Sequence, residues 1–271
     1  MALAAAKMAP LRLALPPSLG KEALRGPAGQ LEAFLSRTLA QPWEVRVADS
    51  YETLAKDILS GRLDMAWAPP FVCARIEAMG VRVLVRGVRR GASTYRAALV
   101  CRAEAKFTLE RLNGLTAMWV DRDSVGGYLL AMAFLKSKGL EPSKTFFAQQ
   151  FAGSYKAALE AVVEGRAEVT SVFTPPASAN ADLLAGVSDI APELRSRLAA
   201  IAVTDESPND GVAVSMSADP ASTVAFERAL LDMHRVPEGI TLLRELFNAE
   251  RFEPAPKMGY RALYRVALAS L

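Results

Sequence analysis

Cysteine and histidine are scarce in this 271-residue chain, which holds only Cys73, Cys101 and His234. A structural zinc site usually takes four cysteine or histidine ligands, so three widely spaced candidates predict no metal site. A nucleophile paired with a base would have to use His234, which precedes a Pro-Glu-Gly break and is typical there of the last turn of a helix. We therefore expect no metal, no other cofactor and no catalytic residue, and two buried free thiols.

Charge of one sign and long apolar runs are also lacking. The chain has 32 basic and 29 acidic residues, and a net charge of +3 is too small to suggest nucleic acid as a partner. No segment reaches the roughly 20 consecutive apolar residues of a membrane-spanning helix, so we expect no insertion into a membrane. The hydrophobic fraction of 51% and the charged fraction of 23% are those of an ordinary globular protein.

The first residues do not resemble an export signal, which needs an apolar core of about 7–15 residues. Lys7 and Arg12 interrupt the apolar stretches here, and Pro10 breaks the middle. We expect a cytoplasmic location for the chain as it stands, and a periplasmic one if a leader has been removed.

Short apolar runs alternate with amphipathic stretches, which predicts βαβ units and an α/β fold with mostly parallel sheets. The pattern restarts near Ser93 and returns near Thr204. We therefore predict two lobes joined by two extended crossovers, the first lobe at 10–93 plus 210–271 and the second at 94–205. Strands are expected at 11–15, 43–48, 65–70, 81–88, 94–102, 115–121, 144–152 and 167–173, and a helix at 124–139 and at 260–271.

Five segments, in register along the chain from about Leu11 to the C-terminus, carry a family resemblance: "SYETLAKDILSGRLDMAWAPP", "GASTYRAALV", "WVDRDSVGGYLLAMAFLKSKGL", "FAGSYKAALEAVVEGRAEV" and "ESPNDGVAV". Together they resemble the phosphonate-binding solute receptors of bacterial ABC transporters. The resemblance implies a two-lobed type 2 periplasmic-binding-protein fold whose lobes close over a small anion. It also implies a monomer that is not an enzyme, with a small-molecule ligand and a transporter permease or signalling protein as partner.

The same resemblance places ligand-binding residues at a helix start, and the chain departs from the family there. Three family hydroxyls correspond to Ser124, Val125 and Gly126, and the family histidine corresponds to Tyr155, while Asp210 keeps an acidic position. Losing two hydroxyls and an imidazole would cost roughly 3–6 kcal/mol of binding free energy. We therefore expect weak binding of aminoalkyl phosphonates.

The loop nevertheless keeps a feature that suits anions. Ser124 and the N–H groups of Val125, Gly126 and Gly127 begin a predicted helix, and such termini attract negative charge. The alternative is that the glycines only make a tight strand-to-helix turn, which Ser124 caps.

Aromatic residues at Tyr51, Trp67 and Tyr95 resemble positions that reach the ligand in the family. Without the resemblance, Trp67 is typical of a core residue in an apolar strand, and Tyr95 is also consistent with packing at a crossover. A basic run allows a further hypothesis, that Arg89 or Arg90 binds a carboxylate or phosphate through two hydrogen bonds. The alternative is a solvated basic face.

Two other function classes compete with the receptor hypothesis. The first is an enzyme on the same fold, of the cofactor-biosynthesis type, for which Asp121, Asp123 and Asp210 could converge. The second is a degenerate protein-interaction module that has lost its ligand.

Two alternatives stay open for Arg122, which could replace the lost hydroxyls by its charge or point into solvent.

Overall fold

The computed structural model describes residues 9–16, 21–177 and 181–264, and the chain divides into two compact units. Unit 1 comprises residues 1–93 and 208–271, and unit 2 comprises residues 94–207, so the chain passes between them twice. The predicted division into lobes that close over a ligand, with limits at 10–93 plus 210–271 and 94–205, stays a prediction.

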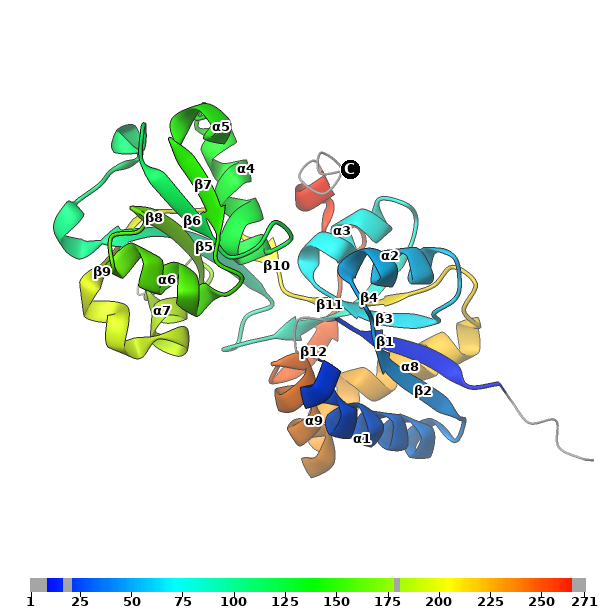
Figure 1. The fold of residues 1–271 in the computed structure, drawn as a ribbon. Coiled ribbons are helices and arrows are strands. Elements are labelled where there is room, and N and C mark those ends of the chain that lie inside the picture. The colour runs from blue at the N-terminus through cyan, green and yellow to red at the C-terminus, as the bar shows by residue number, and fades with distance from the viewer. Residues whose placement is uncertain (1–8, 17–20, 178–180, 265–271) are drawn as a thin grey trace, which may run out of the picture. The chain divides into compact units, whose positions relative to one another are not determined.

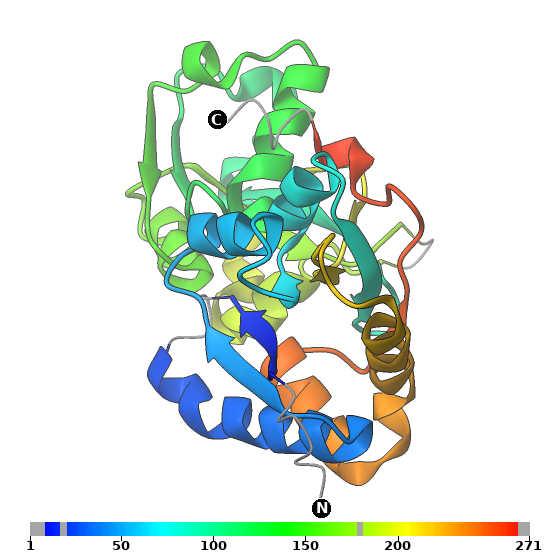
Figure 2. The ribbon, with the colours of Figure 1, turned by 90° about the vertical axis from the view of Figure 1, so that its right-hand side faces the viewer.

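Unit 1 contains a six-stranded sheet in the order β12-β4-β11-β3-β1-β2. β1 pairs in parallel with β2 and β3, whereas β11 is antiparallel to β3 and β4, and β12 is antiparallel to β4. Helices α1, α8 and α9 cover one face of the sheet, and α2 and α3 cover the other (Figures 1 and 2). The strands are β1 (Leu11–Leu15), β2 (Trp43–Val47), β3 (Met65–Ala68), β4 (Arg82–Val88), β11 (Gly211–Val214) and β12 (Arg251–Pro254), and the helices are α1 (Lys21–Leu39), α2 (Tyr51–Leu59), α3 (Pro70–Glu77), α8 (Pro220–Asp232) and α9 (Pro237–Phe247).

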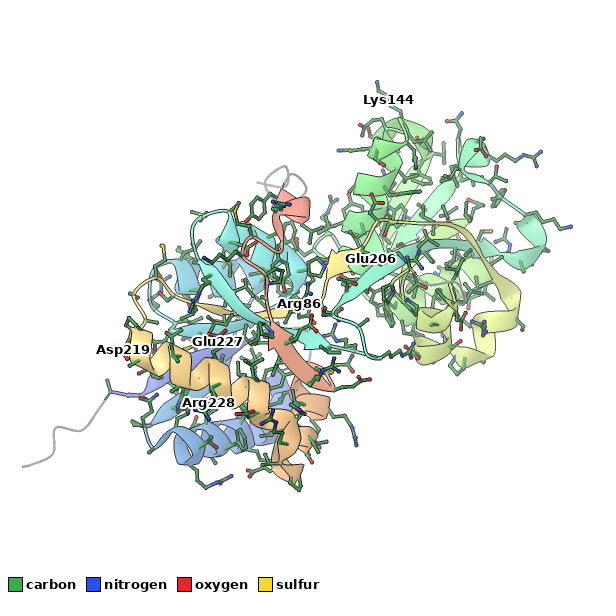
Figure 3. All side chains as sticks on the ribbon, turned by 180° about the vertical axis from the view of Figure 1, so that it is seen from behind. Arg86, Lys144, Glu206, Asp219, Glu227 and Arg228 are labelled. Atoms are coloured by element: carbon green, nitrogen blue, oxygen red, sulfur yellow. The ribbon has the colours of Figure 1, made fainter. Side chains whose placement is uncertain are left out.

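Local sequence explains where these elements begin and end. Ser50 caps α2 by accepting a hydrogen bond from the Thr53 N–H at 3.0 Å. Pro69 and Pro70 end the fully buried β3 and start α3, because proline cannot donate to the sheet but fits the first turn of a helix. At the far edge of the sheet, Arg86 on β4, which is labelled in Figure 3, pairs with Glu253 on β12 at 2.8 Å.

Unit 2 contains a second sheet in the order β10-β5-β8-β6-β7, with β9 also paired to β5. β6 is parallel to β7 and β8, while β5 is antiparallel to β8 and β9. Successive β5 residues face different cores: Leu99 packs with α4 and Val100 with α6 and α7. The elements are β5 (Thr94–Arg102), β6 (Thr116–Trp119), the π-helical turn Val125–Leu129, α4 (Leu130–Ser137), α5 (Pro142–Thr145), β7 (Ala148–Phe151), α6 (Tyr155–Val163), β8 (Val169–Thr174), α7 (Ala185–Ile190), β9 (Leu198–Val203) and β10 (Ser207–Pro208).

The α/β class with two sheets flanked by helices is confirmed, but the strand directions are more mixed than predicted. Parallel neighbours need a crossover, usually a helix, between them. β11 enters unit 1 from the return segment with no such helix, and it lies antiparallel between β3 and β4. β5, which leaves unit 1 by the first crossover, is antiparallel to β8 and to β9.

Three predicted elements differ in detail. The expected strand at 144–152 begins with the short helix α5, and only Ala148–Phe151 is extended. The expected helix at 124–139 starts as a π-helical turn. Of the expected helix at 260–271, the structure describes a 3₁₀ turn at Arg261–Leu263, and residues 265–271 lie outside the described part of the chain.

Candidate functional site

The chain between β6 and α4 folds into a tight turn that ends at a helix cap. The Asp121 carboxylate accepts the Asp123 N–H at 2.9 Å, and the Ser124 N–H donates to the Asp121 carbonyl at 3.2 Å. Ser124 is extended, and its hydroxyl oxygen accepts the Gly127 N–H at 3.1 Å. Ser124 is therefore the cap of the helix, as the sequence predicts.

The first turn of this helix is wider than an α-turn. The Leu129 N–H donates to the Ser124 carbonyl at 3.0 Å, a step of five residues, and the Leu130 N–H donates to the Val125 carbonyl. The first N–H groups of any helix have no acceptor within it, and π-helical turns occur frequently at functional sites. The N–H groups of Val125 and Gly126 belong to this first turn, where partial positive charge favours an anion.

Aromatic residues from three other elements surround Gly126. A Cβ atom on Gly126 would lie 2.9 Å from the Tyr155 hydroxyl oxygen, 3.3 Å from the Tyr95 ring and 3.4 Å from Phe173. The Tyr155 and Ser124 hydroxyl oxygens are 3.4 Å apart. The structure thus brings together four of the predicted site residues, which come from β5, from α6 and from the capped turn.

The backbone of the turn packs closely against β8 and against Val120. The Gly126 carbonyl accepts the buried Ser171 hydroxyl of β8 at 2.7 Å. A Cβ atom on Gly127 would lie only 2.4 Å from the Val120 side chain, so no other residue fits there without rearrangement. Val125 is buried, and its contribution to a site would come from its N–H group.

Arg122 is exposed, as one of the two predicted alternatives has it, and it also makes a contact that the sequence does not indicate. Its guanidinium lies over the Phe151 ring of β7, 4.8 Å from the ring centre, where a cation–π contact is favourable. The stack holds one end of the turn against the edge strand of the sheet.

In unit 1, the predicted clamp residue Arg89 and the predicted site residue Asp210 bind each other. Arg89 also donates from Nε to the Asn248 carbonyl at 2.7 Å and from one terminal nitrogen to the Phe247 carbonyl at 3.2 Å. These carbonyls end α9, where positive charge complements the helix dipole. The backbone N–H of Arg90 donates to the Glu250 carboxylate at 2.8 Å.

The other two candidates in unit 1 occupy different environments. Trp67 is 2% exposed, and its ring packs edge-on against Phe247 and Phe252 at 5.2 and 5.7 Å. The structure therefore gives Trp67 the core role that its apolar strand indicates. Tyr51 is half-buried at the first position of α2, directly after the cap residue Ser50.

Comparison with protein families decides the class of the molecule. The family described as ABC transporter, phosphonate, periplasmic substrate-binding protein matches residues 13–260. The chain belongs to this family. Members are substrate-binding components of transporters, so the receptor hypothesis is confirmed and the enzyme hypothesis is wrong. At the level of the family, the partners are a small-molecule ligand and a permease.

Solved structures share the fold of this phosphonate-family receptor at low sequence identity. XAC2383 from Xanthomonas citri, bound to ATP, is 18% identical with a TM-score of 0.78, over 96% of both chains. PhnD1 from Prochlorococcus marinus, in complex with methylphosphonate, is 17% identical with a TM-score of 0.73, over 96% of this chain and 97% of that one. A binding component of an ABC phosphonate transporter from Pseudomonas aeruginosa is 15% identical with a TM-score of 0.72, over 96% and 85%. The predicted periplasmic-binding-protein fold is confirmed.

The sequence of this receptor did not lead us to Ser171 and Phe173, which contact Gly126 from β8. Ser171 and Phe173 alternate with Thr170 and Val172 along β8, so the period of two in "AEVTSVF" could have placed both on one face. No local signal indicates the role of Asn209. Its buried side-chain amide donates to the Gly87 and Ala92 carbonyls at 3.0 Å.

Neither a metal-ligand cluster nor a membrane-spanning helix is found in the part of the chain that the structure describes. Across 9–16, 21–177 and 181–264, no three histidine, cysteine or acidic side chains gather as metal ligands would. Within the same ranges, no helix combines the length and the apolar character needed to cross a membrane.

Cys73 and Cys101 are free and buried, as predicted, and burial raises the pKa of both thiols above the ordinary value.

Proposed function

We propose that this receptor binds a small anion at the first turn of the helix after β6, with the Ser124 hydroxyl and the N–H groups of Val125 and Gly126 as donors. The carrying observation is the cap geometry. The Ser124 oxygen accepts the Gly127 N–H at 3.1 Å, and its own hydrogen is donated to the Tyr155 oxygen, from which it can turn toward an anion. The 3.4 Å separation from the Tyr155 oxygen is long for an O–H···O bond, so turning that hydrogen toward an anion costs little.

The acidic residues of the turn oppose this proposal only weakly. Asp121 and Asp123 are exposed, and one Asp121 oxygen is already held by the Asp123 N–H. Charges in solvent are screened over about 8 Å at physiological salt, whereas donors in direct contact with an anion are not. Contact donors therefore outweigh the two exposed carboxylates.

The favoured ligands are compact carboxylates, phosphate or phosphonates without an amine. An ammonium group needs an acidic partner, and Asp210, which keeps an acidic position of the family, is already bound to Arg89. PhnD1, which shares the fold, was solved with methylphosphonate, an anion of this kind. Tyr51 and Tyr95 remain predicted contributors, whereas the packing of Trp67 against Phe247 and Phe252 favours its core role. A permease or a signalling protein remains the proposed partner of a monomeric receptor.

Titration calorimetry with phosphate, methylphosphonate, acetate and 2-aminoethylphosphonate tests the proposal. At least one of the first three should bind, and 2-aminoethylphosphonate should bind most weakly. Ser124→Ala should then weaken the bound anion by about 1.5–3 kcal/mol, because a hydrogen bond to a charged group is lost.

Ser124→Ala also removes a helix cap, so the matched control is a cap elsewhere. Asp219 caps α8 by accepting the Ser222 N–H at 2.7 Å, and Figure 3 shows it at the start of that helix. Asp219→Ala should cost a comparable stability, about 1 kcal/mol, and leave anion affinity unchanged. Equal anion affinity in Ser124→Ala and wild type would reject this site. Binding of none of the four anions would instead favour the degenerate interaction module.

A further inference from the structure

We infer that Gly126 and Tyr155 form a compensating pair, in which the Tyr155 hydroxyl supplies a second side-chain donor to the anion site from the space that glycine leaves open. The inference rests on the proposed function and makes Tyr155 a determinant of anion affinity. Tyr155 is the first residue of α6, and its ring reaches the capped turn that follows β6. Its hydroxyl oxygen lies 3.4 Å from that of Ser124, so both can donate to one anionic group.

Space, and not backbone conformation, explains why residue 126 is glycine. Seven glycines of the described chain have the positive φ that disfavours other residues, and Gly126 is not among them. A serine would be allowed by the backbone, but its Cβ would lie 2.9 Å from the Tyr155 hydroxyl oxygen. Contacts this short are repulsive, so a side chain at 126 would displace the Tyr155 hydroxyl from its present position.

The Tyr155 ring is held in this orientation by its neighbours. It packs edge-on against Phe173 with the ring centres 5.5 Å apart. Ser154 caps the start of α6, because its side-chain oxygen accepts the Ala157 N–H at 3.2 Å. On the other side, the Gly126 peptide is fixed by the Ser171 hydroxyl at 2.7 Å. The hydroxyl therefore faces the helix start without further ordering, which favours its use as a donor.

A double-mutant cycle on the full chain tests the pair, with inorganic phosphate and methylphosphonate as probes in calorimetry. Tyr155→Phe should weaken the anion that binds by about tenfold or more while changing the melting temperature little, since only the hydroxyl is removed. Gly126→Ser should weaken binding as well and should lower the melting temperature, because the new side chain meets the hydroxyl.

The variant with both changes should bind more tightly than either single variant, because serine restores a hydroxyl where phenylalanine has vacated the space. Tyr128→Phe is the matched control: this tyrosine lies in the same π-helical turn but packs against Trp119 and Phe151, and its loss of a hydroxyl should not alter affinity.

The outcomes separate the inference from the function on which it rests. If Ser124→Ala weakens binding and Tyr155→Phe does not, the pair is wrong and the anion site stands. A double variant that binds as weakly as the product of the single losses, with no coupling, also rejects the pair. If wild type binds neither probe, both the inference and the proposed site fall together.

Discussion

The two units hold their predicted ligand-binding residues in opposite ways. In unit 2, the hydroxyls of Ser124 and Tyr155 lie at the start of a helix. The protein supplies hydrogen-bond donors there, and an anion would be the acceptor. In unit 1, Asp210 is bound by Arg89, and Trp67 is enclosed by two phenylalanine rings. A residue whose type suits ligand binding can therefore also be held by contacts within the fold, and the two units differ in these contacts.

The difference arises from what surrounds each group. Arg89 meets a carboxylate and two carbonyls at the end of α9, so its positive charge is satisfied within unit 1. Ser124 meets backbone N–H groups, which repel a cation and attract an anion. Mutations in unit 1 should therefore reduce stability more than binding, and those in the unit 2 turn should do the reverse.

The largest effect on stability is expected for Trp67→Ala. Removing a fully buried indole that packs on Phe247 and Phe252 should lower the free energy of unfolding by about 3–5 kcal/mol. Urea denaturation measures this loss, and Tyr155→Phe serves as the unit 2 comparison with little change expected. A loss under about 1 kcal/mol in Trp67→Ala would show that the indole is not a core residue.

Tyr260→Phe should have the next largest effect. The Tyr260 side chain is fully buried, and its hydroxyl donates to the Asn209 carbonyl at 2.7 Å on the return segment. Deleting the hydroxyl leaves a buried carbonyl without this donor, at a cost of about 1–3 kcal/mol in unfolding free energy. The ring volume is unchanged, so a cavity cannot explain the loss. Equal stability of this variant and wild type would contradict the expectation.

How far the sequence predicts the molecule depends on the distance over which each interaction acts. The cap at Ser124 and the bounds of β1 follow from local spacing, and both were predicted closely. Arg89 and Asp210 are 121 positions apart, and Tyr260 and Asn209 are 51 apart. Such pairings depend on how β11 enters the sheet, which no local pattern encodes.

The same limit applies to the candidate site. The resemblance predicts ligand-binding roles for both Tyr155 and Gly126, but it does not reveal that the hydroxyl of Tyr155 lies where a side chain at 126 would be. The alternation of residues along β8 predicts which side chains share a face with Phe173, but it does not predict which residues pack against that face. The role of Phe173 was missed for this reason. Sequence alone therefore located the turn, Tyr95 and Tyr155, but not Ser171 and Phe173.

A third change, Asp210→Asn, directly probes the contrast between the units. The ion pair with Arg89 is only partly exposed, 21% and 30% for the two side chains, so its loss should cost about 1 kcal/mol of unfolding free energy. Affinity for methylphosphonate should stay within about twofold of wild type, since the Asp210 carboxylate is already bound and a change that small is under 0.5 kcal/mol. A tenfold loss of affinity in calorimetry would return Asp210 to the ligand site.

The smallest effect concerns the C-terminal segment of unit 1 and appears only at high pH. The Tyr264 hydroxyl donates to the Glu77 carboxylate at 3.0 Å, and burial together with this bond raises the pKa of Tyr264 from 10 to about 12. Between pH 10 and 12 the unfolded chain releases a proton that the folded protein keeps, so the contribution is fully present below pH 10 and is lost as pH rises through 12. Tyr264→Phe has no such proton, so its unfolding free energy should fall less steeply than that of wild type across this window. Chemical denaturation at pH 9 and 11 measures both slopes. Parallel slopes would show that Tyr264 is solvated like a free phenol, and Glu77 would then hold the segment only through the Tyr260 N–H, which it accepts at 3.0 Å.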